Sequence, residues 1–326
     1  MNRREFIGDL ASAGAATLLA SSMGSASAAQ KSIQKPPSKK MPLYIFSKHL
    51  QWLDYDGMAK AAAELGFDGV ALTVRRGGHV LPERVETDLP KAVAAVRKAG
   101  IDVGMLITDV YDVSDPVTEK ILRTASGLGI RYYRLGYMHY DQDKDILEQL
   151  EATRPKMKAL ADMNQNYKIF GGNHNHTGNC IGTSLWDAWD LFKGLNPEWI
   201  GFQYDTGNGF NEGIGGSWKT NARLVASRIK MLAVKTGDKW GQPEWQNDTI
   251  NKRENRPILT RKDFDWFFGM LKKTGVEGPV AVHYEFPGLG GAETGAKELK
   301  GMSKEEVLAI IRRNLNILKE MIAKTG

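Results

Sequence analysis

Residues 43–73 read LYIFSKHLQWLDYDGMAKAAAELGFDGVALT, and this stretch decides the fold. A run rich in aromatic and β-branched side chains (43–47) predicts a strand, and a second run (68–73) predicts another. Between them, apolar residues recur at helical spacing over 56–65, and a glycine follows where the helix would end. A strand, a crossover helix and a second strand form the repeating unit of a parallel sheet.

The same unit recurs to the end of the chain. It predicts six further strands, at 102–108, 131–136, 167–172, 200–205, 229–235 and 279–285. It predicts the accompanying helices at 89–99, 116–127, 144–163, 184–193, 217–228, 262–273 and 303–323. Eight strand-and-helix units predict a single (β/α)8 TIM barrel of the α/β class. The alternative, a doubly wound open sheet, lacks the Gly-rich phosphate-binding turn after its first strand.

The N-terminus is predicted to stand apart from the barrel. An arginine pair (residues 3–4) precedes a weakly apolar stretch and a small-residue cleavage site (26–28), so residues 1–29 predict a twin-arginine (Tat) signal peptide. The alternatives are a chance arginine pair or an anchor, but the apolar stretch is too short for a stable membrane anchor. Residues 30–41 predict a flexible linker, which leaves 42–326 for the barrel. The expected partner is the Tat export machinery, and the expected location is periplasmic or secreted.

Net charge bears on the class of ligand. The 326 residues include 44 basic and 38 acidic side chains, and the pI is near 9.1. Residues 1–40 hold six basic and two acidic residues, whereas the remainder holds 38 and 36. The expected barrel is therefore close to neutral, which argues against a nucleic-acid partner. The one cysteine, Cys180, excludes an internal disulfide framework and is interpreted as a buried, inert thiol rather than a nucleophile.

Polar residues gather where the predicted strands end, which is where barrel enzymes have their active sites. The six histidines all lie after a predicted strand or near its end: His49, His79, His139, His174, His176 and His283. Asp205, Lys235 and Glu285 each close a predicted strand. Histidine and carboxylate side chains from different strands bind Mn²⁺, Mg²⁺, Co²⁺ or Zn²⁺, so the pattern predicts a divalent metal site. A hydrogen-bonded polar cluster without a metal is the alternative.

Four short motifs follow one another at these positions: GGNHNH (171–176), DTGN (205–208), AVK (233–235) and Glu285. Their order and strand placement resemble the xylose isomerase-like TIM barrels, also called sugar phosphate isomerases/epimerases, over residues 42–323. The resemblance implies one divalent metal held by carboxylates and a histidine. The candidate ligands in this chain are His176, Asp205, His283 and Glu285.

Two departures from the family pattern concern this metal site. Asn179 stands where members of the family often have a ligand glutamate. Ala233 stands where they commonly have a histidine. Two alternatives follow: other histidines rebuild a different site, or the metal is lost.

Isomerisation, epimerisation and β-elimination of sugars share one step, the removal of a proton from a carbon next to a carbonyl group. Glu285 or a histidine is the candidate base, and His139 is among the histidines considered. Lys235 and Arg134 are the candidates to stabilise the resulting enediolate. The alternatives for Lys235 are a Schiff base and a structural salt bridge to Asp205 or Glu285.

Candidate substrate-binding residues surround the predicted mouth of the barrel. Flat aromatic faces suit sugar rings, although rim packing is the alternative, and the candidates are Trp52, Trp218, Trp240 and Trp245. The polar candidates are His49, His174, Asn179 and Asn208. Together with the export signal, these residues predict a small, neutral, unphosphorylated sugar or keto-glycoside as the substrate.

The sequence therefore predicts an exported sugar isomerase, epimerase or lyase, with a divalent metal. One alternative is a catalytically decayed barrel that only binds carbohydrate. Another is an apurinic endonuclease-like nuclease, which the near-neutral barrel and the export signal disfavour. The sequence leaves open whether the chain forms a homo-oligomer.

Overall fold

The computed structural model describes residues 41–213, 216–236, 250–251, 256–257, 259–284, 299 and 301–325. Eight parallel strands close into a barrel, in the order β1-β10-β7-β6-β5-β4-β3-β2 around the ring. The strands are β1 (Leu43–Phe46), β2 (Gly69–Val74), β3 (Asp102–Thr108), β4 (Tyr132–Arg134), β5 (Phe170–His174), β6 (Ile200–Asp205), β7 (Ile229–Thr236) and β10 (Val280–Tyr284). The prediction of a single (β/α)8 barrel is confirmed.

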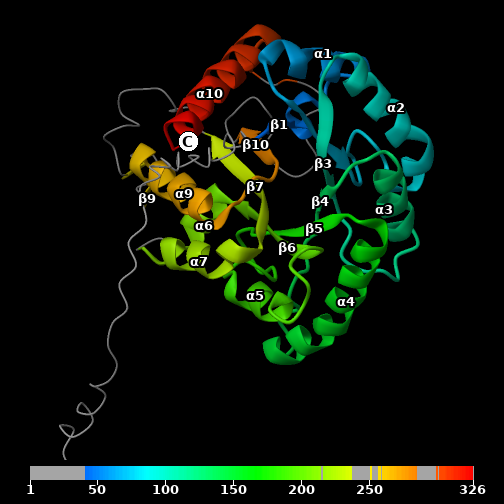
Figure 1. Cartoon of the computed structure of the whole chain (residues 1–326), viewed down its shortest axis with the longest axis vertical. Helices are drawn as coiled ribbons and strands as arrows, with labels where there is room; N and C mark the ends of the chain where they lie inside the picture. Colours follow the sequence, from blue (N-terminus) through cyan, green and yellow to red (C-terminus); the bar gives the residue numbers. More distant parts are fainter. Residues whose placement is uncertain are drawn as a thin grey trace, which may run out of the picture. The chain divides into compact units, whose positions relative to one another are not determined.

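Helices follow one another around the outside of the strands, as the colour sequence in Figure 1 shows. They are α1 (Tyr55–Leu65), α2 (Val85–Lys98), α3 (Thr118–Gly127), α4 (Ile146–Tyr167), α5 (Trp186–Phe192), α6 (Thr206–Glu212), α7 (Ser217–Val225), α9 (Arg261–Thr274) and α10 (Lys304–Thr325). Short 3₁₀ helices occur at Ser47–Leu50 (η1), Pro82–Arg84 (η2) and Ala226–Arg228 (η3), and β8 (Ile250–Asn251) pairs with β9 (Arg256–Pro257). Side chains cap several helices: Asp54 begins α1, Asp145 begins α4, and Thr260 begins α9 with a reciprocal capping box.

The core has two parts. The larger part lies between the strands and the helices, where apolar side chains of both are buried. The smaller part fills the inside of the barrel and consists of Phe46, Ala71, Met105, Ile107, Phe170, Met231 and Ala281, with Tyr44 and Tyr132 packed against it. Gly104 makes room for this filling, because a Cβ there would lie 2.2 Å from the Tyr44 ring. The barrel interior is therefore plugged, and the polar groups described below lie at the ends of the strands.

One departure from the expected element boundaries, at β5, bears on the site. The predicted strand was 167–172, but α4 continues to Tyr167 and ends at Lys168, which has a left-handed φ of 51°. The strand therefore begins at Phe170 and ends at His174. His174 consequently lies in a strand and is buried, not in the loop where the sequence placed it.

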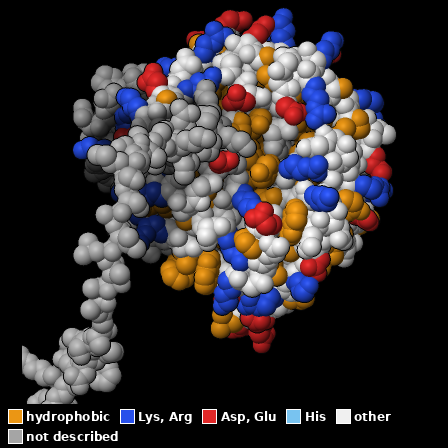
Figure 2. Space-filling model, in the orientation of Figure 1, with side chains coloured by type: hydrophobic (Ala, Val, Ile, Leu, Met, Phe, Trp, Pro, Cys, Tyr) orange, Lys and Arg blue, Asp and Glu red, His pale blue; other side chains and the backbone are white. Residues whose placement is uncertain are grey.

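Two further observations concern ligands and membranes. On the face shown in Figure 2, the described Lys and Arg side chains are interspersed with Asp and Glu side chains rather than joined into one basic surface. Among the described residues, no helix is long and apolar enough to cross a membrane. The predicted signal peptide (1–29) and nearly all of the linker (30–41) lie outside the described residues.

Candidate functional site

Asp205 is the centre of a buried polar group at the end of β6. Its Oδ1 accepts a hydrogen bond from the backbone N–H of Asn208 at 2.7 Å, and so caps α6. Its own backbone is clamped by Asn175, whose Oδ1 accepts from the Asp205 N–H (2.8 Å) and whose Nδ2 donates to the Asp205 carbonyl (3.1 Å). Because both its side chain and its backbone are held, the carboxylate has a fixed position in the site.

Two buried histidines face the other carboxylate oxygen. His174 Nε2 lies 3.5 Å from Asp205 Oδ2, and His283 Nδ1 lies 3.9 Å from the same atom. The two rings are stacked, with centroids 5.7 Å apart and planes at 28°. Phe46 packs on the His283 ring at 4.5 Å between centroids. One carboxylate oxygen therefore lies within 4 Å of the rings of both histidines.

Burial lowers the pKa of His174, His283 and His49 well below the usual value for histidine. After burial, the next cause for His174 is the positive charge of Arg134, followed by that of Lys235. For His283 the next causes are His174 and then Lys48, and for His49 the next cause is Lys48. The imidazoles are therefore neutral near pH 7 and have lone pairs that accept protons.

His49, which follows the first strand of the barrel, lies next to the last strand and beside His283. Its Nε2 accepts a hydrogen bond of 3.0 Å from the backbone N–H of Tyr284, next to His283. The neutral ring must therefore carry its hydrogen on Nδ1, which has no hydrogen-bond partner among the described residues. The His49 and His283 rings are 6.4 Å apart between centroids. His49 is thus an oriented hydrogen-bond donor beside the histidine pair.

Two cations flank the histidines. Lys235, near the end of β7, donates from Nζ to Asn208 Oδ1 at 2.7 Å. Arg134, the last residue of β4, is only 2% exposed and donates from Nη1 to the Tyr137 hydroxyl at 3.0 Å. Its guanidinium also lies 4.8 Å from the Tyr137 ring centroid. The structure therefore brings the predicted stabilisers Lys235 and Arg134 to the same end of the barrel as the histidines.

Gln203 belongs to this group and was missed by the sequence reasoning. It is fully buried and pairs in register with His174 on the neighbouring strand. Its Nε2 contacts the Met105 sulfur at 3.2 Å. The available signal was the alternation along β6, which places residues 203 and 205 on the same face as Gly201. A glutamine in that inward row indicates a polar site rather than core filling.

His139 and Asn179 were predicted as site residues, but the structure places both in another contact. His139 is exposed, and its Nδ1 lies 3.2 Å from Asn179 Oδ1 and 3.3 Å from Cys180 Sγ. This contact joins the loops after β4 and β5. His139 and Asn179 are therefore outside the buried group around Asp205. Cys180 itself is buried, as predicted.

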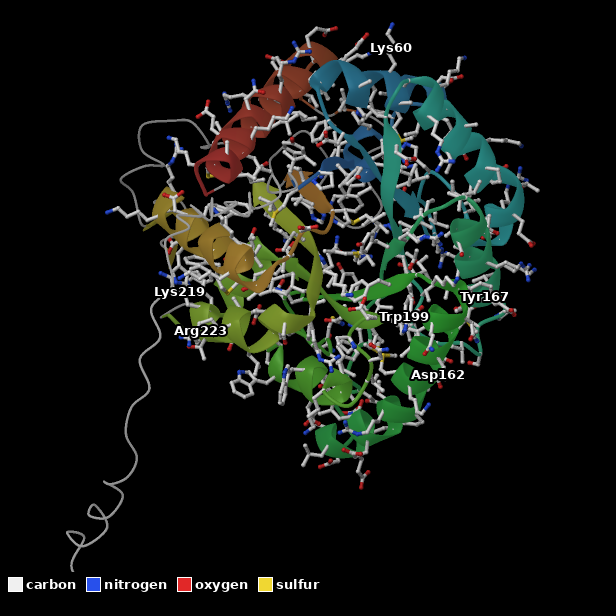
Figure 3. The ribbon with its side chains drawn as sticks, in the orientation of Figure 1. Lys60, Asp162, Tyr167, Trp199, Lys219 and Arg223 are labelled. Carbon is white, nitrogen blue, oxygen red and sulfur yellow. The ribbon has the colours of Figure 1, made fainter. Side chains whose placement is uncertain are left out.

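The structure bears on two of the four tryptophans predicted to bind the substrate. Trp218 is 5% exposed and packs edge-on against Phe210 and Trp266, so its prediction as a substrate platform is corrected to a core residue. Lys219, labelled with Arg223 on α7 in Figure 3, lies over the Trp218 and Trp266 rings at 5.3 Å. Trp52 is half-buried and donates from Nε1 to the His49 carbonyl at 3.2 Å. Trp240 and Trp245 lie outside the described residues.

The predicted metal ligands are brought together in part. Asp205 and His283 are neighbours, whereas His176 is half-buried, with Nδ1 2.8 Å from the Thr177 carbonyl and its ring centroid 6.2 Å from that of His174. Glu285 lies outside the described residues. Among the residues that the structure describes, no three His, Cys, Asp or Glu side chains form a group that fits a metal ion.

The comparisons with solved structures agree with this architecture. A D-allulose 3-epimerase from Methylomonas sp. superposes with a TM-score of 0.60 at 13% identity, covering 87% of this chain and 98% of that one. The 3-keto-D-glucoside 4-epimerase from E. coli gives 0.59 at 10% identity, with coverages of 86% and 99%. A putative xylose isomerase from Rhodospirillum rubrum gives 0.60 at 15% identity, with coverages of 86% and 99%. At these identities the likeness shows the fold.

The sequence comparisons decide the family. No curated protein matches the chain. The model of the xylose isomerase-like TIM barrel family matches residues 59–306, which is most of the barrel and more than half of the chain. This match supports the expectation of an enzyme with sugar isomerase or epimerase chemistry. The chain belongs to the xylose isomerase-like TIM barrel family.

Proposed function

We propose that the protein is a sugar isomerase or epimerase that removes a proton from a carbon next to a carbonyl group. The observation that carries the proposal is the pair of buried imidazoles, His174 and His283, around the carboxylate of Asp205. Structural neighbours with the same fold are named as 3-epimerases of free sugars and as a 4-epimerase of a keto-glucoside. We extend the proposal to unphosphorylated sugars and keto-glycosides on this support.

The proton transfer is assigned to His283. With the hydrogen of its neutral ring placed on Nδ1, toward Asp205, the lone pair on Nε2 takes the proton from the substrate carbon. The imidazolium that forms is stabilised by the adjacent carboxylate, which compensates for the low proton affinity that burial imposes. His174, on the other side of Asp205, is a second acid–base group that returns a proton, as epimerisation requires.

Lys235 is assigned to the oxygen that gains negative charge. Its ammonium is held by Asn208, and Asn208 is itself fixed by donating from Nδ2 to the Asn175 carbonyl at 2.9 Å. A cation that is already oriented stabilises the enediolate without reorganisation. If the substrate carries a leaving group on the next carbon, the same proton removal forms a C=C bond while the C–O bond breaks. The alcohol then departs with a proton, and the reaction is that of a lyase.

The metal stays a prediction and has no step in this mechanism. Its expected contribution, when bound, is to polarise the substrate carbonyl. Elemental analysis of the purified protein, before and after dialysis against EDTA, measures it. A stoichiometric Mn, Mg, Co or Zn content that EDTA removes would support the prediction, and absence of any divalent ion would refute it.

Proton exchange tests the proposed reaction without knowledge of the product. The protein is incubated in D₂O with ketohexoses and 3-keto-glycosides, with and without EDTA, and loss of the α-proton signal is followed by NMR. We expect exchange in the wild type and a loss of about a hundredfold or more in His283→Gln and Asp205→Asn. His139→Gln, which lies outside the buried group, is the control and is expected to retain full exchange. Binding without exchange in a folded preparation would favour a carbohydrate-binding barrel instead.

We also propose that the protein is exported by the twin-arginine route. The support is the arginine pair at residues 3–4 followed by the weakly apolar stretch. Replacing both arginines by lysine keeps the charge and removes the pair. Fractionation of cells that express each version is expected to show the wild type in the periplasm and the variant in the cytoplasm. Equal distribution of the two would contradict the proposal.

A further inference from the structure

Arg134 is a buried cation whose described contacts are all neutral. Nη1 donates to the Tyr137 hydroxyl, Nη2 contacts the Thr108 carbonyl at 3.4 Å, and Nε has no hydrogen-bond partner among the described residues. No carboxylate of the described residues lies within ion-pair distance of its guanidinium. An arginine keeps its positive charge inside proteins. Such a charge is costly to bury without an opposite charge close by.

Lys235 shows the same feature on the other side of His174. The hydrogen bond of its ammonium is to the amide oxygen of Asn208, and among the described residues it has no ion-pair partner. Asn208 also donates its backbone N–H to Asp205 Oδ1 at 2.7 Å, so one residue joins the Lys235 ammonium to the carboxylate that His174 faces. The Tyr137 ring, which covers the Arg134 guanidinium, lies 6.2 Å from the His174 ring between centroids. The two positive charges therefore flank one catalytic imidazole.

The described part of the site has fewer negative charges than positive ones. Asp205 is its buried carboxylate, and the Oδ2 atom of Asp205 faces the rings of His174 and His283. Among the described residues, the two cations Arg134 and Lys235 therefore outnumber the one buried carboxylate of the site. An enediolate formed during the reaction would engage one of these cations. It does not account for a second cation that is held permanently in the interior.

We propose that the substrate is a sugar acid, a uronate or its keto derivative, whose carboxylate is bound in the field of Arg134 and Lys235. Lys235 is half-buried and is the direct contact. Arg134 acts from behind Tyr137, whose hydroxyl accepts its hydrogen bond and is polarised by it. The proposal rests on the proposed function, since it names the substrate class of the same site. It replaces the neutral sugar that the composition favoured.

Binding of methyl glycosides, in which the anomeric carbonyl group is blocked, tests this inference separately from isomerisation. Calorimetric titrations compare the methyl glycoside of D-glucuronate with that of D-glucose, and the methyl glycoside of D-galacturonate with that of D-galactose, so that each pair differs at the carboxylate. We expect each uronate to bind the wild type about tenfold more tightly or better, because a charge-assisted contact is stronger than a neutral one. The preference is expected to weaken as salt is raised from 25 to 300 mM.

Two arginine substitutions make the test specific. Arg134→Met removes the buried charge and keeps an unbranched apolar stem, and it is expected to abolish most of the preference for uronates. Arg131→Met removes an exposed arginine immediately before β4, and is expected to leave the preference intact. Arg134→Lys is expected to restore part of it. Urea unfolding of each variant verifies that the compared proteins are folded.

The outcomes separate this inference from the proposed reaction. Equal affinity for acidic and neutral sugars in the wild type overturns the inference, as does an Arg134→Met variant that keeps the uronate preference. Proton exchange on neutral keto-sugars alone would uphold the reaction and refute the sugar acid. A uronate preference without proton exchange on any substrate would uphold the sugar acid and refute the reaction.

Discussion

The free energy of unfolding of this protein should fall more steeply on acidification than titration of its surface charges alone would cause. His49, His174 and His283 are fully buried, and their pKa values are lowered well below the usual value of histidine. In the unfolded chain these residues titrate near the ordinary value of about 6.5, so the unfolded state binds more protons as the pH falls. Stability is therefore fully present above about pH 6.5 and decreases below it. A histidine that stays neutral in the folded state throughout this range removes about 2 kcal/mol between pH 7.5 and pH 5, which sets an upper limit of about 6 kcal/mol for the three together.

Urea unfolding measured by circular dichroism at pH 7.5, 6.5, 5.5 and 5 tests this value. The samples contain EDTA, so that metal binding does not enter the linkage. This upper limit is comparable to the whole stability of a typical domain, so the urea midpoint is expected to fall steeply between pH 6.5 and pH 5. Replacing His49 by glutamine should reduce the pH-dependent loss by up to about 2 kcal/mol, whatever its effect at pH 7.5. A flat stability between pH 7.5 and pH 5 would refute the reasoning.

Three substitutions test single contacts. Gly207→Ala places a Cβ 2.6 Å from Lys235 Cδ, so it should displace the lysine and lower kcat/KM by about tenfold or more, with no loss of stability in urea unfolding. Tyr133→Phe leaves the buried Asn164 Oδ1 without its 2.8 Å hydrogen bond and should cost about 1–2 kcal/mol in the same assay. Thr260→Ala removes the cap of α9 and should cost about 1 kcal/mol, and an unchanged urea midpoint would contradict it.

The strands were predictable because they are buried on both faces. The boundaries expected for β3 and β6 agree with the structure, since both are short runs in which buried apolar residues predominate. The expectation failed at β5, where Lys168 adopts a left-handed conformation that favours glycine, so the helix end carried no glycine signal. Helix α6 was also missed, because two of its seven residues are glycines, which weaken a helical pattern.

The sequence indicated which types of residue form the site and at which ends of the strands they lie. It did not indicate which of these residues come into contact. Asp205 closed one predicted strand and His283 lay near the end of another, and the structure places the two side chains together. His139 also followed a strand, yet the loop after β4 carries it to Cys180, and loop paths do not follow from residue spacing. Trp218 was assigned to the rim because it follows a glycine-rich stretch, whereas the apolar face of α7 takes it into the core. Whether an aromatic side chain covers a substrate or a core depends on packing that spacing does not encode.

The hydrogen bond between the backbone N–H of Tyr284 and His49 Nε2 has a consequence for folding order. It links residues 235 positions apart, and it lies where β10 and β1 meet to complete the ring. Contacts of such long sequence separation form late, because a long loop of chain must be closed before they give any stabilisation. An incompletely synthesised or partly folded chain would therefore lack the oriented His49 and the neighbouring His283. Chemistry would begin only when the last strand is in place, so catalytic activity is itself a measure of barrel closure.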